Sequence, residues 1–164
     1  MKKFAFIIKT NEFNDFKKYV FKTWIDNLPE DYDAFIMFDK TYNEHSEEHI
    51  GNLISCRLVL KENVIVYDEN TFLENGFPII SRDDLLKTNK GKDIANWYGG
   101  NTMLIYNMAY QEPYFFKLHP DYDRYFVIED DILFNGDYSL LFETVEKTNV
   151  DFLPINIYCD AKED

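Results

Sequence analysis

Three consecutive carboxylates end an apolar stretch in the last third of the chain. The residues from Tyr125 to Ile128 are aromatic or β-branched, and Glu129, Asp130 and Asp131 follow them directly. Side chains alternate along a strand, so we expect Glu129 and Asp131 on one face and Asp130 on the other. Two carboxylates about 4 Å apart near a surface repel by a few kcal/mol, and a hard cation such as Mg²⁺ or Mn²⁺ would remove that repulsion. The triplet therefore predicts a metal or substrate site, unless it only caps the turn that follows.

The stretch before the triplet predicts a buried strand, because short apolar runs rich in aromatic and β-branched residues are typical of strands. Three earlier runs predict further buried strands, at residues 4–8, 34–38 and 63–67. Each ends in polar residues. Between the first two runs, apolar residues at helical spacing predict a helix that begins at Asn11 or Asn14 and ends at Pro29. In open α/β sheets the carboxyl ends of the strands are where ligands bind.

Alternating strands and helices predict an α/β fold. We expect a Rossmann-like three-layer sandwich, with a mainly parallel central sheet flanked by helices, formed by residues 1–164 as a single domain. A helix is predicted from Asn101 until Pro113 closes it, and another from Asp137 or Ser139 to about Lys147. Residues 71–96 have only a weak pattern, and residues 151–158 predict one more strand.

Charge and composition exclude several classes of protein. The 30 acidic residues outnumber the 17 basic ones, for a net charge of −13, which disfavours nucleic-acid binding as the main task. The two cysteines, Cys56 and Cys159, have no metal-binding spacing, so we expect a reduced, cytoplasmic compartment. No stretch approaches the roughly 20 apolar residues of a transmembrane segment. His45 and His49 are spaced like two ligands on one helix, but a solvated helix or loop fits that polar segment better.

The order of these elements, with adjacent carboxylates after a central strand, resembles the nucleotide-sugar-binding half of a GT-A glycosyltransferase. The segment 126–132 resembles the E-D-D element of some N-acetylglucosaminyltransferases. This resemblance implies that Asp131 binds Mn²⁺ or Mg²⁺ directly and that Glu129 binds it directly or through water. It implies that Asp130 accepts hydrogen bonds from the ribose or the donor sugar. The base and ribose would lie over the early strand ends, where the candidates are Thr10, Asn11 and Asp39.

A longer stretch, from Trp97 to Glu143, is similar to a family of uncharacterised glycosyltransferase-like proteins. Their pattern runs W-x-x-G, then P-D-Y-D-x-Y-x-x-I-E-x-D, then G-[DN]-[WY]. The matching positions in this chain are Trp97 with Gly100, residues 120–131, and residues 136–138.

The resemblance implies a metal-dependent glycosyltransferase, or its donor-binding half, that takes a nucleotide diphosphate sugar as donor and a glycan or other acceptor. GT-A enzymes also need a stretch that forms the acceptor site, and nothing after Tyr158 predicts one. One alternative is therefore a non-catalytic GT-A-like domain that binds carbohydrate or protein. A second is a metal-dependent phosphoryl hydrolase, which would recruit Asp39 and Asp68 to the acidic triplet.

Overall fold

The structure is a computed structural model that describes residues 4–41, 44–78, 87 and 110–148. The chain divides into two compact units, Met1–Leu133 and Phe134–Asp164. The first unit contains a β-sheet and four described α-helices. In the second unit the described residues form one helix, α8 (Tyr138–Lys147).

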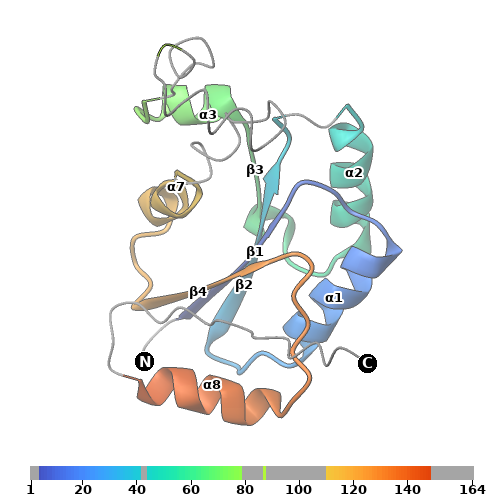
Figure 1. Ribbon diagram of the computed structural model, residues 1–164, viewed down its shortest axis with the longest axis vertical. Helices are drawn as coiled ribbons and strands as arrows, with labels where there is room; N and C mark the ends of the chain where they lie inside the picture. The colour runs from blue at the N-terminus through green and yellow to red at the C-terminus, as the bar shows by residue number, and fades with distance from the viewer. Residues whose placement is uncertain (1–3, 42–43, 79–86, 88–109, 149–164) are drawn as a thin grey trace. The chain divides into compact units, whose positions relative to one another are not determined.

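The sheet of the first unit has four described strands, all parallel, in the order β3-β2-β1-β4 (Figure 1). The strands are β1 (Phe4–Thr10), β2 (Tyr32–Asp39), β3 (Val64–Tyr67) and β4 (Arg124–Glu129). The central strand, β1, pairs with β2 on one side and β4 on the other, so that Ile8 lies beside both Ile36 and Ile128. The predicted α/β class and parallel sheet are confirmed, and the carboxyl ends of all four strands meet at one edge.

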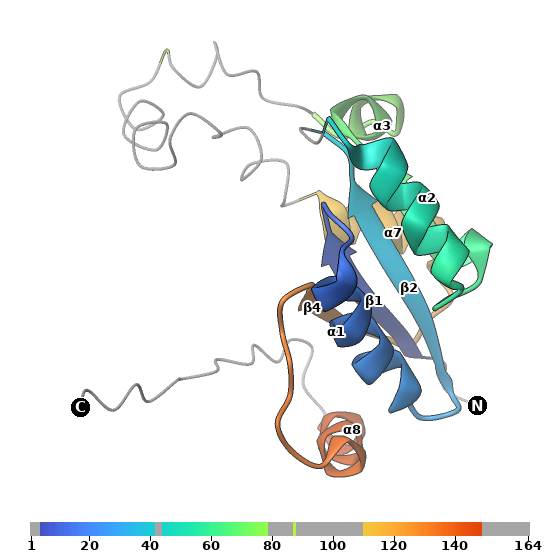
Figure 2. The same ribbon diagram turned by 90° about the vertical axis from the view of Figure 1, so that its right-hand side faces the viewer.

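Helices cover both faces of this sheet (Figure 2). The helices α1 (Asp15–Asp26) and α2 (Ser46–Cys56) lie on one face, and α3 (Glu69–Glu74) and α7 (Gln111–Leu118) lie on the other. Two covered faces explain why β1 is an unbroken apolar run, since every residue from Phe4 to Ile8 is buried.

The alternation of side chains along β1 divides the core into two halves. Toward α1, the ring of Phe6 lies 5.4 Å from those of Trp24 and Phe126, measured between centroids. Toward α3 and α7, a second cluster packs Ala5 and Ile7 with residues of both helices. Contacts between aromatic rings form much of this second half of the core. The ring of Phe35 packs against that of Phe115, and the ring of Phe72 packs against those of Tyr67 and Tyr114.

Side-chain caps fix where several helices begin. The Asn14 side chain accepts a hydrogen bond from the Lys17 amide at 2.9 Å, so α1 starts at one of the two predicted positions. Asp137 caps α8 in the same way. A capping box between Asp68 and Thr71 begins α3, a helix of six residues in the segment whose sequence pattern is weak.

The predicted role of Pro113 is wrong. Pro113 does not close a helix but lies in the first turn of α7, as its third residue. Proline is tolerated there because the first amide groups of a helix have no partner within it. The predicted helix start at Asn101, the glycosyltransferase-like residues Trp97 and Gly100, and the predicted strand at 151–158 lie outside the described residues.

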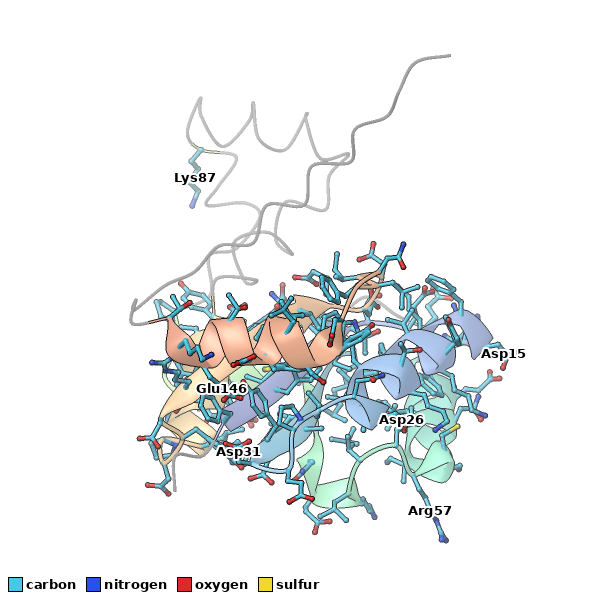
Figure 3. All side chains as sticks on the ribbon, turned by 90° about the horizontal axis from the view of Figure 1, so that it is seen from below. Asp15, Asp26, Asp31, Arg57, Lys87 and Glu146 are labelled. Atoms are coloured by element: carbon cyan, nitrogen blue, oxygen red, sulfur yellow. The ribbon has the colours of Figure 1, made fainter. Side chains whose placement is uncertain are left out.

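Charged side chains mark the surface of the first unit. Figure 3 shows Asp15 and Asp26 at opposite ends of α1 and Arg57 pointing outward at the end of α2. Arg57 adopts a left-handed conformation (φ 51°) and its amide bonds back to the Ile54 carbonyl, which closes that helix. Among the helices that the structure describes, none is long and apolar enough to cross a membrane.

Candidate functional site

An open pocket of about 140 Å³ lies at the carboxyl edge of the sheet. The last residue of each described strand lines it, together with three residues next to those strand ends in sequence and one residue of α7. The lining residues are Lys9, Thr10, Asn11, Asp39, Tyr67, Gln111, Glu129 and Asp130. The chain runs from β1 through β2 to β3 in one direction, and then places β4 on the other side of β1. Parallel α/β sheets bind ligands where the strand order reverses in this way.

Lys9 is the cation of the pocket. Its Nζ lies 2.8 Å from Glu129 Oε1 at the end of β4 and 2.8 Å from Glu112 Oε1 in the first turn of α7. The Lys9 side chain is 11% exposed, whereas that of Glu129 is 50% exposed. Burial alone disfavours the charged ammonium, but the hydrogen bonds and charges of Glu112 and Glu129 outweigh it, so the pKa of Lys9 is raised.

Asp130 is held by a second lysine on the opposite face of the sheet. Its Oδ1 accepts a hydrogen bond from Lys17 Nζ in α1 at 2.6 Å, and its Oδ2 lies 2.5 Å from the Thr10 hydroxyl oxygen. The Thr10 hydroxyl also lies 2.6 Å from the Glu12 carbonyl oxygen and accepts a bond from the Glu12 amide. Thr10 is therefore occupied in joining β1 to β4 and to the loop after it.

Two lysines neutralise the first two carboxylates of the acidic triplet. As the alternation predicts, Glu129 and Asp130 lie on opposite faces, and each is paired with a different ammonium. The predicted repulsion is between Glu129 and Asp131, and the Lys9 ammonium reduces it on the Glu129 side. Binding of a divalent cation by these two carboxylates stays a prediction. The lysines come from β1 and α1, more than a hundred residues away along the chain.

Asp39 and Tyr67 form the side of the pocket at the ends of β2 and β3. Asp39 is 9% exposed, and its Oδ1 accepts a hydrogen bond from the Thr41 amide at 2.8 Å. Burial raises the pKa of Asp39, although the bonds from Thr41 oppose this rise. Burial likewise raises the pKa of Tyr67, whose hydroxyl hydrogen-bonds to the side chain of Gln111. This side of the pocket therefore offers polar atoms of buried residues that are held by hydrogen bonds.

Asp131 follows the strand in an exposed turn and is not among the lining residues. The turn is fixed on both sides, because the Ile132 amide bonds to the Glu129 carbonyl and the Ile132 carbonyl accepts a 2.7 Å bond from the Trp24 indole. Trp24 is 2% exposed in α1, so the residue after Asp131 is tied to the core. Asp131 is thus a solvent-facing carboxylate on a well-anchored turn.

The residues at this edge suit a divalent cation only in one binding mode. In the described part of the chain, no three His, Cys, Asp or Glu side chains are grouped so that they could hold a metal ion. Mg²⁺, however, is often bound by one or two carboxylates together with the phosphates of a substrate. The exposed Glu129 and Asp131 carboxylates provide hard oxygen ligands of that kind.

Five of the six site residues expected from the sequence line this one pocket: Thr10, Asn11, Asp39, Glu129 and Asp130. Sequence reasoning missed three lining residues, Lys9, Tyr67 and Gln111, and it missed Lys17, which pairs with Asp130. Lys9 could have been noticed, because it stands at the end of a strand expected to share an edge with the acidic triplet. His49 is one of the two histidines considered as metal ligands. Its Nδ1 contacts the backbone of Phe13, which links α2 to the loop before α1.

The chain matches no protein-family model, no curated protein and no solved structure in the comparisons made with it.

Proposed function

We propose that this chain is a GT-A-like domain that binds a nucleotide diphosphate sugar with a divalent cation, as the donor-binding part of a glycosyltransferase. One observation carries the proposal: residues singled out at the ends of three strands, Thr10 and Asn11, Asp39, and Glu129 with Asp130, line a single pocket where the strand order reverses. That position is the usual ligand site of a parallel sheet.

The nucleoside would lie on the side of the pocket formed by Asn11 and Asp39. Asp39 is buried and fixed by Thr41, so its remaining acceptor capacity is already oriented for a donor group of a base or ribose. Tyr67 and Gln111 complete this wall. Thr10 acts in a different way from the one implied by the resemblance, because its hydroxyl is already committed to Asp130 and Glu12.

The diphosphate would lie toward Lys9 and Glu129. Three carboxylates and one lysine line the described pocket, so a diphosphate needs additional positive charge there. Mn²⁺ or Mg²⁺ held by Asp131 and Glu129 would supply it, and would stabilise the charge of the departing nucleoside diphosphate. Asp130 would act mainly through its bonds to Lys17 and Thr10, which hold the end of β4 against β1.

Thermal melting tests this proposal in four arms: the protein alone, with Mn²⁺, with UDP or GDP and EDTA, and with Mn²⁺ plus UDP or GDP. We expect a large rise of Tm only when both ligands are present. A ligand at about 100 times its Kd adds about 2.7 kcal/mol of stability. No shift with either nucleotide would contradict the proposal and favour a domain that binds carbohydrate or protein. An equal shift in EDTA would show that the lysines alone supply the positive charge.

A further inference from the structure

Among the described residues that line the pocket, Lys9 is the only one with a positive charge. Its ammonium has two partners at the same distance: Glu129 in the sheet, and Glu112 in α7, each at 2.8 Å. The partners differ in exposure, because the Glu129 side chain is 50% exposed and that of Glu112 is 32% exposed. Lys9 therefore joins a more accessible carboxylate to a more sheltered one.

A divalent cation that binds Glu129 without a diphosphate lies close to the Lys9 ammonium, which already contacts that carboxylate. Two positive charges on one carboxylate repel each other, so the cation must compete with Lys9 for Glu129. Lys9 keeps Glu112 as a partner if it loses Glu129, which allows the exchange without stranding a buried charge. A ligand phosphate would add a third acceptor, and an ammonium has three donors.

We propose that Lys9 makes divalent-cation binding at this site depend on the diphosphate: it neutralises Glu129 in the free protein and contacts a ligand phosphate when nucleotide and cation bind together. This inference rests on the proposed function and adds a specificity-determining residue to it. A cation alone then binds weakly, and the site is selective for a cation that is already bound to a phosphate ligand.

The substitution Lys9→Met tests this, because it removes the charge and keeps most of the side-chain volume. Binding of Mn²⁺ alone is measured from the electron paramagnetic resonance signal of free Mn²⁺. We expect Lys9→Met to bind Mn²⁺ alone about tenfold more tightly, within the 5- to 150-fold range of coupled ligands. At saturating Mn²⁺, equilibrium dialysis should show UDP or GDP bound about tenfold more weakly, also within that range. If Lys9 had only a structural role, the substitution would weaken the binding of Mn²⁺ and of the nucleotide alike.

Two further variants complete the design. Lys22→Met removes an exposed lysine of α1, which pairs with Asp26, and is expected to change neither affinity. Glu112→Gln leaves the Lys9 ammonium with Glu129 as its remaining charged partner, so Mn²⁺ alone should bind more weakly than to the wild type. Glu112→Gln therefore provides an independent test of the inference if Lys9→Met does not fold.

The inference is overturned if Lys9→Met binds Mn²⁺ alone no more tightly than the wild type, or if Glu112→Gln does not weaken Mn²⁺ binding where Lys9→Met cannot be measured. In either case the proposed function stands as long as the wild type binds UDP or GDP with Mn²⁺. If the wild type binds neither nucleotide, the proposed function fails instead. The inference is supported if Lys9→Met binds Mn²⁺ alone more tightly than the wild type but binds UDP or GDP more weakly.

Discussion

Lys17 Nζ lies 2.6 Å from Asp130 Oδ1, and this pair joins helix α1 to the end of strand β4. Both side chains are mostly buried, with 11% and 15% exposed. The contact holds Asp130, the middle residue of the acidic triplet, on the α1 face of the sheet, while Lys9 holds its neighbour Glu129 on the other face. Two of the three carboxylates of the triplet are thus held by ion pairs in the free protein.

Cutting this pair from one side should destabilise the protein. Lys17→Met leaves the Asp130 carboxylate without its ammonium, and we expect a loss of about 1–3 kcal/mol, somewhat less than the 3–5 kcal/mol of a fully buried pair. Urea unfolding measures the change. The double variant Lys17→Met with Asp130→Asn should lose less than the sum of the two single losses. Strictly additive losses would mean that the two groups do not stabilise each other.

The pH dependence of stability should reveal the free-energy cost of burying the ionised Asp39 carboxylate. Burial raises the pKa of Asp39 above its unfolded value, which is near 3.9, so the fold favours the protonated form. This favourable contribution is complete below the unfolded pKa and is lost as pH rises through the folded pKa. Asp39→Asn should therefore raise Tm at pH 7, with a gain that shrinks as pH falls toward about 4.

Glu30→Gln serves as the control for Asp39→Asn, because Glu30 is exposed in the loop between α1 and β2. Its substitution changes an exposed surface side chain and should alter Tm little at any pH from about 4 to about 8. A gain from Asp39→Asn that is constant across this range would contradict the pKa shift.

The half of the core that faces α7 should depend strongly on Phe115. This residue is fully buried and contacts Phe35 with a distance of 5.0 Å between ring centroids. Phe115→Ala should cost about 3–5 kcal/mol of unfolding free energy through lost burial and the cavity left behind. Leu118→Ala, at a 42% exposed position of the same helix, should cost far less. Denaturant unfolding separates the two, and equal losses would contradict the assigned packing.

Asp131 should affect ligand binding without affecting the fold. It is exposed on a turn anchored by the bond from Trp24 to Ile132, so Asp131→Ala removes no buried contact. We expect its Tm without ligands to match the wild type, and its Tm rise with Mn²⁺ plus UDP or GDP to be lost. Asp137→Ala is an informative contrast, because it removes the cap of α8 and should lower stability by about 0.5–2 kcal/mol while keeping the ligand response. A normal response from Asp131→Ala would refute its role as a metal ligand.

The strands and the edge that they share could be predicted because the sheet is buried on both faces. Such strands are continuous apolar runs, and the polar residues after them identify the carboxyl edge without any knowledge of neighbours. The strand that ends at Glu129 and the helix start at Asn14 could also be predicted, because each depends on residues that are close together in sequence. Helix α3 was not, because six residues are too few for a periodic pattern.

The pairing of charges could not be predicted, because it depends on contacts between distant parts of the chain. Lys17 and Asp130 are 113 residues apart in sequence, and only the sheet and its covering helix bring them together. The placement of Pro113 failed for a related reason: a proline is compatible with either the first turn of a helix or the residue after one, and the sequence pattern around it did not separate these.

Paramagnetic broadening by Mn²⁺ in the presence of UDP or GDP tests the central claim most directly, because it reports where the cation lies. In a ¹H–¹⁵N spectrum, we predict that the amide signals of Asn11, Asp130 and Asp131 broaden first as Mn²⁺ is added. Signals from the opposite ends of the strands, such as Phe4 and Arg124, should keep their intensity. Broadening that starts at those residues, or at α2, would contradict a diphosphate and cation site at the carboxyl edge between β1 and β4.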